Sequence, residues 1–101
     1  MYYVYILTNK TKTVLYTGVT NNLVNRITEH YNNRGDKRTF TGRYSCFYLI
    51  FFEEFFNISN AISREKEIKN RPRSWKDELI RKENLQWVFL NALIFEVWPP
   101  V

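Results

Sequence analysis

A chain of 101 residues has room for one domain with a single modest hydrophobic core. Hydrophobic residues make up 45% of the sequence, aromatic residues 18% and charged residues 25%, a composition that excludes an intrinsically disordered chain. The formal net charge of +5 and the isoelectric point near 9.5 favour a polyanionic partner such as nucleic acid, although many proteins carry such an excess on a solvated surface.

Cysteine and histidine are each used once, at Cys46 and His30. One cysteine cannot build a disulfide framework, and one residue of each kind is too few for a zinc site, which needs about four such ligands. The first residues lack the basic start and apolar run of a signal peptide. The most apolar late stretch, Leu85 to Trp98, is too short to span a bilayer and contains Asn91 and Glu96. We therefore expect a cytoplasmic protein without a membrane segment.

Two segments near the N-terminus predict the first strands. Tyr3 to Thr8 and Leu15 to Thr20 are both rich in aromatic and β-branched residues. The polar residues Asn9 to Thr13 between them predict a hairpin loop.

The pairing of these strands bears on function. A symmetric turn within the loop would place Tyr5 opposite Tyr16 and Tyr3 opposite Gly18, so that two phenols share one face of the sheet. Gly18 would leave that face open, and a glycine within a strand often marks the close approach of a ligand or of another backbone. An ordinary aromatic pair with a bulge remains the alternative.

A helix is expected from Leu23 to about Asn32, because apolar residues recur there on one face and Asn21 or Asn22 can cap its start. Arg26 and His30 are four residues apart, so they project together from the edge of the apolar stripe and could reach into a cleft. The alternative is a solvated arginine beside a surface or core histidine.

The middle of the chain predicts a loop and a third strand. Residues Asn32 to Arg43 are polar, basic and glycine-containing, which indicates a surface loop. Tyr44 to Phe52 is apolar on both alternating faces, which is typical of a central strand covered on both sides.

Two more helices are expected. Ser59 can cap a helix that runs to about Asn70 and ends before Pro72, because proline lacks the backbone N–H and clashes with the preceding turn. A further helix is expected over Ser74 to Lys82, where the segment Ser74 to Asp77 resembles a capping box.

The end of the chain is ambiguous. Leu85 to Trp98 could be a helix or a strand packed on the sheet, or an association surface, and a Pro-Pro pair closes it. No repeat, low-complexity tract or linker divides the sequence. We expect one domain over residues 1–101, with a core of about 1–83 and an apolar extension over 84–101.

The second predicted helix turns a carboxylate inward. On a helical wheel Ala61, Ile62 and Ile68 define the buried stripe, and Glu65 falls within it, whereas Glu67 points away. Burying an ionised glutamate without a partner costs several kcal/mol, so this side chain should meet an arginine, a metal ion or a proton. A purely structural ion pair is the alternative.

Taken in order, these residues resemble the GIY-YIG nuclease family. Tyr3 to Tyr5 and, eleven residues further on, Tyr16 to Gly18 look like the two halves of its motif in divergent form. The sequence GVTNNLVNRITEH resembles the continuation, where Arg26 matches an arginine on the first helix and His30 stands where relatives carry His or Tyr. AISREKEIK resembles the helix with the metal-binding glutamate, and Glu65 takes that place.

The resemblance covers about the first eighty residues and looks most like the short, stand-alone branch of the family. Tyr3 replaces the first glycine of the motif, Thr17 its central isoleucine, and Val19 a lysine found just after the second half in some relatives. The lysine matters most, because a nearby cation could lower a tyrosine's pKa. Either turnover is slow or another group takes over that task.

The predicted elements make an α+β fold, and the resemblance implies the same: a small, largely antiparallel three-stranded sheet flanked by helices. It also implies phosphodiester hydrolysis with one Mg²⁺ or Mn²⁺ ion anchored by Glu65. Arg26 would hold the phosphate, Tyr5 is the first choice for general base with Tyr16 as its partner, and His30 could relay the proton. An unperturbed tyrosine has a pKa of about 10, so it needs nearby cations to act near neutrality.

Two basic segments could contact backbone phosphates, which supply affinity but little sequence information. They contain Arg34, Lys37, Arg38 and Arg43 after the first helix, and Lys69, Arg71, Arg73 and Lys76 between the later helices. A solvated basic surface is the alternative.

These observations predict a metal-dependent endonuclease that acts on nucleic acid, on DNA more than on RNA, with low intrinsic sequence specificity. Two alternatives stay open: a nucleic-acid-binding module that has lost turnover, and a subunit that works through a protein partner. A homodimer through residues 85–98 is also expected as an option, because that stretch is rich in aromatic residues.

Overall fold

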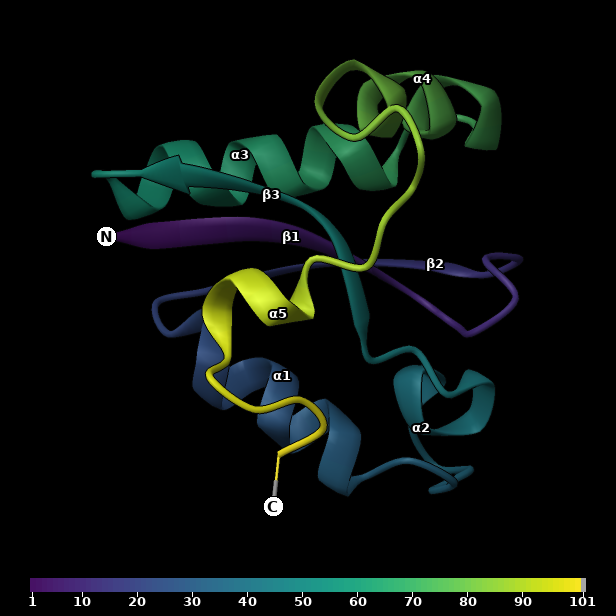
Figure 1. Cartoon of the computed structure of the whole chain (residues 1–101). Coiled ribbons are helices and arrows are strands. Elements are labelled where there is room, and N and C mark those ends of the chain that lie inside the picture. The colour runs from purple at the N-terminus through teal and green to yellow at the C-terminus, as the bar shows by residue number, and fades with distance from the viewer. Residues whose placement is uncertain (101) are drawn as a thin grey trace.

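Three strands form one antiparallel sheet in the computed structural model, which describes residues 1–100 (Figure 1). β1 (Tyr2–Thr8) lies between β2 (Leu15–Thr20) and β3 (Tyr48–Phe55). With its helices the sheet makes an α+β fold, which confirms the expected class and the three-stranded sheet. The central strand is β1, and the prediction that the third strand would be central is wrong.

The part of the chain that the structure describes contains five helices: α1 (Leu23–Asn32), α2 (Phe40–Tyr44), α3 (Ile58–Lys69), α4 (Arg73–Glu83) and α5 (Asn91–Ile94). Figure 1 shows α3 and α4 on one side of the sheet, and α1 and α5 on the other. Within residues 1–100, no helix has the length and apolar character needed to cross a membrane.

The central strand contributes side chains to two hydrophobic clusters, because successive side chains of a strand point to opposite faces. Val4 and Ile6 are fully buried against a cluster that includes Ile68 of α3. Tyr5 and Leu7 are fully buried in the second cluster, with residues of α1 and β3. Tyr5, the candidate catalytic residue of β1, therefore faces α1.

The register of the hairpin between β1 and β2 is shifted by two residues from the one that a symmetric turn would give. Tyr5 lies opposite Gly18, not opposite Tyr16. The side chain of Asn9 accepts a hydrogen bond from the backbone N–H of Thr13 at 2.9 Å, which holds the loop open and moves its centre along the chain. A shift of two residues leaves every side chain on its original face, so Tyr5 and Tyr16 share one face as predicted.

The helix expected from Leu23 to about Asn32 is confirmed, and the side chain of Asn22 caps it by accepting from the backbone N–H of Asn25. The expectation of a plain loop over residues 32–43 is only partly right, because that segment contains the start of α2. Thr39 caps α2, and its hydroxyl accepts from the backbone N–H of Gly42 at 3.1 Å.

The third strand begins later than predicted, at Tyr48 instead of Tyr44. Tyr44 ends α2, and Ser45 adopts the left-handed backbone conformation with φ of 56°, which separates the helix from the strand. The apolar character on both faces is confirmed, since side chains of β3 contribute to both hydrophobic clusters.

The starts of α3 and α4 differ from the predicted caps. Asn57, and not Ser59, caps α3, because its side-chain oxygen accepts from the backbone N–H of Ser59 at 2.7 Å. α4 follows Pro72 without a side-chain capping hydrogen bond, so Ser74 to Asp77 is not a capping box. The positions of both helices are nevertheless close to those predicted.

The C-terminal stretch covers the outer edge of β3 as an irregular segment with one short helix. The backbone N–H of Leu90 donates to the carbonyl oxygen of Leu49 at 2.6 Å. The buried side chain of Asn91 accepts from the backbone N–H of Leu49 and donates to the carbonyl oxygen of Phe47. Asn84 donates to another carbonyl oxygen of β3. These bonds satisfy backbone polar groups of an edge strand, which can therefore be buried.

The aromatic residues of this stretch pack within the chain. The hydrophobic residues that lie against the two clusters are Trp87, Phe89, Leu90, Ile94, Phe95 and Trp98, whereas Leu85, Val88, Leu93 and Val97 are exposed. The exposed hydrophobic side chains of residues 85–98 are thus aliphatic. A homodimer through this stretch stays a prediction.

Candidate active site

A pocket of about 220 Å³ lies beside α1, α2 and β2. Its lining residues are Tyr16, Arg26, His30, Asn33, Thr39, Phe40 and Thr41. Three residues selected from the sequence, Tyr16, Arg26 and His30, therefore line one pocket.

Tyr5 reaches the back of this site across Gly18. A Cβ atom at position 18 would lie 2.5 Å from Cζ of Tyr5 and 3.0 Å from its Cε1, which is too close for a side chain. The absence of a side chain at Gly18 therefore lets the phenol cross over β2. The ring centroid of Tyr5 lies 6.3 Å from that of Tyr16.

His30 is buried, and its two ring nitrogens bridge the hydroxyl groups of Tyr5 and Thr41. Its Nε2 atom lies 3.1 Å from the hydroxyl of Tyr5, and its Nδ1 atom lies 3.0 Å from the hydroxyl of Thr41. Burial, aided by the positive charge of Arg26, lowers the pKa of His30 to about 4, so the ring is neutral at pH 7. A neutral imidazole has one donor and one acceptor, so the proton positions along the chain Thr41–His30–Tyr5 are coupled.

The two tyrosines differ in their access to solvent. Burial raises the pKa of Tyr5 above its ordinary value and the neighbouring Tyr16 adds to the shift, while Arg26 opposes it. Tyr16 is half-buried, lines the pocket and lies outside the hydrogen-bonded chain of His30. Tyr16 is thus the phenol that a substrate could meet.

Arg26 lies one turn before His30 on α1, and both side chains point to the same pocket. The guanidinium donates to Glu29 at 2.8 Å, and the two side chains are 40% and 58% exposed. An exposed ion pair contributes about 0–1 kcal/mol. A phosphate can therefore replace Glu29 at little cost in free energy.

Glu65 is turned inward, as predicted, with its side chain 16% exposed, against 43% for Glu67. Ile62, which was expected in the buried stripe, is 37% exposed, so that part of the prediction is wrong. The carboxylate of Glu65 lies 3.4 Å from Nζ of Lys69, and this Nζ lies 5.8 Å from the ring centroid of Tyr16. Glu65 does not line the pocket itself, and Lys69 connects it to Tyr16.

Glu65 is the candidate ligand for a metal ion. Residues 1–100 contain no group of three or more His, Cys, Asp or Glu side chains that could enclose one. A single carboxylate fits a hard cation such as Mg²⁺, which keeps several waters and takes further oxygen ligands from a substrate phosphate. It does not fit a closed zinc site.

The basic residues after α1 lie around a second pocket. Lys37, Arg38 and Arg43 line this pocket of about 270 Å³ next to Phe40, which also lines the first pocket. Arg38 pairs with an aspartate two residues away, yet its side chain is 89% exposed. Arg34 lies over a tyrosine ring at 3.9 Å. Lys37, Arg38 and Arg43 therefore lie next to the candidate site.

The basic side chains near α4 form hydrogen bonds and an ion pair within the fold. Arg73 donates to the carbonyl oxygens of Thr13 and Lys12 at 2.8 and 3.2 Å, which ties α4 to the first hairpin. Arg71 lies 3.7 Å from a carboxylate of α3. Lys76 donates to the carbonyl oxygen of Lys69 at 3.5 Å. The contacts of Arg73 give it a structural task in the fold.

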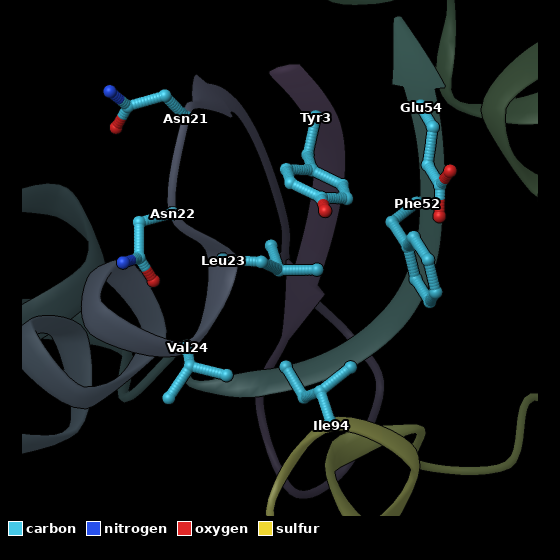
Figure 2. Close-up of a pocket in the computed structure, with 8 residues that line it drawn as sticks. All are labelled: Tyr3, Asn21, Asn22, Leu23, Val24, Phe52, Glu54 and Ile94. Atoms are coloured by element: carbon cyan, nitrogen blue, oxygen red, sulfur yellow. The ribbon is translucent and has the colours of Figure 1, made fainter. Parts of the chain in front are cut away.

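A larger cavity, of about 410 Å³, lies on the other flank of α1 (Figure 2). Figure 2 shows Leu23, Tyr3, Phe52 and Ile94 pointing toward its centre from four different elements. Its lining contains no arginine or lysine and includes the carboxylate of Glu54. A phosphate would meet no cation there, so this cavity is not the candidate site for phosphodiester chemistry.

The contribution of α2 to the site was not expected from the sequence. Thr41 orients His30, and Phe40 covers one side of the pocket with its ring centroid 6.1 Å from that of Tyr16. The available signal was Thr39, a residue type favoured at helix N-caps, followed by a short segment that could form one turn. That signal is weak within a segment that is otherwise typical of a loop.

Comparisons with known proteins identify the family. A family model described as the GIY-YIG catalytic domain matches residues 1–79. A UPF0213 protein of Clostridium perfringens is 45% identical over 86 residues, which cover 85% of this chain and 89% of the relative. A UPF0213 protein of Pediococcus pentosaceus is 38% identical over 84 residues, which cover 83% of this chain and 85% of the relative.

A solved structure has the same fold. The solution NMR structure of a UPF0213 protein from Bacillus halodurans aligns with a TM-score of 0.56 and 29% sequence identity, over 93% of this chain and 98% of that one. The matched residues 1–79 include all three strands and the candidate residues from Tyr5 to Glu65. The chain therefore belongs to the GIY-YIG family, the nuclease family that its sequence resembles, and its relatives there are UPF0213 proteins.

Proposed function

We propose that this protein is a metal-dependent endonuclease that hydrolyses phosphodiester bonds in nucleic acid, DNA more than RNA, with little intrinsic sequence specificity. The observation that carries the proposal is the pocket in which Tyr16, Arg26 and His30 meet. A phenol, a guanidinium and a neutral imidazole on one pocket wall supply a proton acceptor, a phosphate-binding group and a proton relay. Membership of the GIY-YIG family supports hydrolysis as the reaction.

Arg26 binds the phosphate in this proposal. Its planar guanidinium can donate two parallel hydrogen bonds to phosphate oxygens, and it is only loosely held by Glu29. Because the negative charge on those oxygens grows as the water attacks, the same contacts strengthen in the transition state. Arg26 therefore acts on both binding and rate.

Tyr16 is the proton acceptor that we infer for the attacking water. The sequence favours Tyr5 for this role, but the burial of Tyr5 and its raised pKa keep that phenol neutral and away from solvent at pH 7. Tyr5 instead holds His30, whose ring centroid lies 5.5 Å from that of Tyr16. From this position His30 can relay a proton between the pocket and Thr41.

Glu65 would hold one Mg²⁺ or Mn²⁺ ion through its carboxylate. When bound, such an ion stabilises negative charge on the phosphate and on the departing oxygen. The inward position of Glu65 on α3 keeps its carboxylate at a defined place, because only 16% of the side chain is exposed. Lys69 pairs with it and limits its movement.

The basic side chains beside the pocket support nucleic acid as the substrate. Lys37, Arg38 and Arg43 can contact backbone phosphates, which are the same for every base sequence. We therefore infer that the chain binds with low sequence specificity.

A cleavage assay on mixed DNA and RNA substrates tests the proposal. The folded protein should cut with Mg²⁺ or Mn²⁺ and stop cutting when EDTA removes the ion, and DNA should be cut faster than RNA. A folded protein that binds these substrates and cuts none of them with either ion would instead support a binding module without turnover.

A further inference from the structure

Lys69 differs from the other basic residues in its surroundings. It lies in the last turn of α3, and its ammonium lies near two candidate catalytic residues from different elements. Nζ lies 3.4 Å from Oε2 of Glu65 and 5.8 Å from the ring centroid of Tyr16. Lys69 therefore lies between the candidate metal ligand and the candidate proton acceptor, not on a peripheral docking surface.

We propose that Lys69 belongs to the catalytic centre, where its ammonium positions Glu65 and stabilises negative charge that develops beside Tyr16. This inference rests on the proposed nuclease function and assigns to Lys69 an electrostatic part in the reaction. Lys69 does not form or break a covalent bond in this role, and it gives no proton to the substrate.

The charges around Tyr16 explain why such a group is needed. A tyrosine side chain can accept a proton only as its phenolate, and nearby cations stabilise the negative charge of that form. His30 supplies no charge, because burial keeps its ring neutral. The cations that face Tyr16 are Arg26 from α1, which also lines the pocket, and Lys69 from α3.

Position 19 cannot provide this cation in the present chain. Val19 packs against the hydrophobic cluster on the α3 side of the sheet and, with Ile58 and Ile62, lines a small apolar pocket. Tyr16 lies with the other cluster, on the α1 side. Lys69 reaches Tyr16 from the end of α3 and so takes the electrostatic task that Val19 leaves open.

The ion pair with Glu65 predicts how Lys69 affects metal binding. In the absence of a metal ion the ammonium neutralises the Glu65 carboxylate. A divalent cation that binds Glu65 must compete with it, because two cations near one carboxylate repel each other. Removing the ammonium should therefore leave metal binding equal or tighter while cleavage becomes slower.

Three variants of the full chain separate this role from docking and from fold stability. Lys69→Met removes the charge, Lys69→Arg keeps it, and Lys66→Met removes a charge from an exposed position on the same helix. For each variant we would measure the single-turnover cleavage rate at saturating metal and substrate, the affinity for the same DNA, the affinity for Mn²⁺ by electron paramagnetic resonance, and the melting temperature.

The expected result is a dissociation between rate and binding. Lys69→Met should cleave about tenfold or more slowly, bind DNA within about threefold of the parent, and bind Mn²⁺ equally or up to about fivefold more tightly. Lys69→Arg should restore most of the rate. Lys66→Met should match the parent in rate and in Mn²⁺ affinity.

Three results would overturn the inference. The first is a Lys69→Met variant that cleaves at the parental rate. The second is a cleavage rate and a DNA affinity that fall by the same factor, as expected for a docking lysine. The third is an Mn²⁺ affinity and a melting temperature that fall together, as expected for a structural lysine. A parent protein that cuts no substrate would reject the nuclease function itself. An active parent with an unaffected Lys69→Met variant would reject only the role of Lys69.

Discussion

The ring of Tyr5 lies over Gly18, the residue that pairs with it across the first hairpin. This relationship places the phenol next to His30, where the two side chains share a hydrogen bond of 3.1 Å. A side chain at position 18 would push against a ring that is fully buried.

Gly18→Ala should therefore destabilise the fold by about 1–3 kcal/mol, the usual cost of overpacking a core, and should slow cleavage because the ring of Tyr5 no longer holds His30 in place. Chemical denaturation and the cleavage assay measure both effects. In a Tyr5→Leu background the added methyl group meets a smaller side chain, so its cost should be lower. An equal cost in both backgrounds would mean that the contact with Tyr5 is not the cause.

His30 should make stability depend on pH between about 6.5 and 4. Its pKa is lowered from 6.5 to about 4 by burial in the folded protein, so as pH falls through this window the unfolded chain binds a proton that the folded chain does not. The contribution of His30 to the free energy of unfolding is thus fully present above pH 6.5 and is lost as the pH falls toward 4. The loss amounts to about 3 kcal/mol at pH 4.

The comparison with His30→Gln isolates this contribution, because acidic residues titrate in both proteins. The parent should lose about 3 kcal/mol of stability relative to the variant between pH 7 and pH 4. Denaturant unfolding at a series of pH values provides the measurement. A stability difference that stays constant over this range would show that His30 titrates normally in the folded protein.

The affinity for nucleic acid should fall steeply with salt and depend little on base sequence. If Lys37, Arg38 and Arg43 neutralise phosphates, the counterions of those phosphates are released on binding, so replacing all three residues with glutamine should reduce the slope of log K against log salt by about one per lost contact. Lys82→Gln, an exposed change on α4, serves as the control. Affinity that is the same at low and moderate salt would reject this mode of binding.

Arg26→Lys should depress cleavage more than binding. The substitution keeps the positive charge but loses the bidentate guanidinium, so the rate should fall about tenfold or more while the affinity stays within about threefold. Arg81→Lys, at an exposed position of α4 outside the site, should change neither quantity. Equal losses in rate and affinity would assign Arg26 to simple docking.

Much of this site follows from local sequence patterns. The alternation of β1 puts Tyr5 on the face of Leu7, the spacing of four residues puts Arg26 and His30 on one side of α1, and the helical period turns Glu65 inward. Each of these relationships depends only on the geometry of a single element, which is why the sequence predicts them.

The features that the sequence did not predict depend on specific contacts of single side chains, within a loop or between elements. The hairpin register depends on the side chain of Asn9 bridging its own loop, and the formation of α2 depends on Gly42, where a Cβ atom would lie 2.7 Å from the carbonyl oxygen of Asn33. Lys69 was expected among docking residues, and only the three-dimensional structure shows it next to Tyr16. No periodicity within a single segment encodes such neighbours.

Glu65→Gln tests the proposed mechanism most directly, because it keeps the size of the side chain and removes the charge that would hold the metal ion. The partner Lys69 is 48% exposed, so loss of their ion pair should cost about 1 kcal/mol or less, and the melting temperature should change little. Cleavage with Mg²⁺ should fall by about a hundredfold or more. DNA binding in metal-free buffer should be equal or tighter, because a negative charge has gone.

Stability, binding and Mg²⁺-dependent cleavage should be measured on the same preparation of this variant. We expect a folded protein that binds DNA and does not cut it. A folded, binding-competent Glu65→Gln protein that cuts at the parental rate would contradict the assignment of Glu65 as metal ligand and the one-metal mechanism with it.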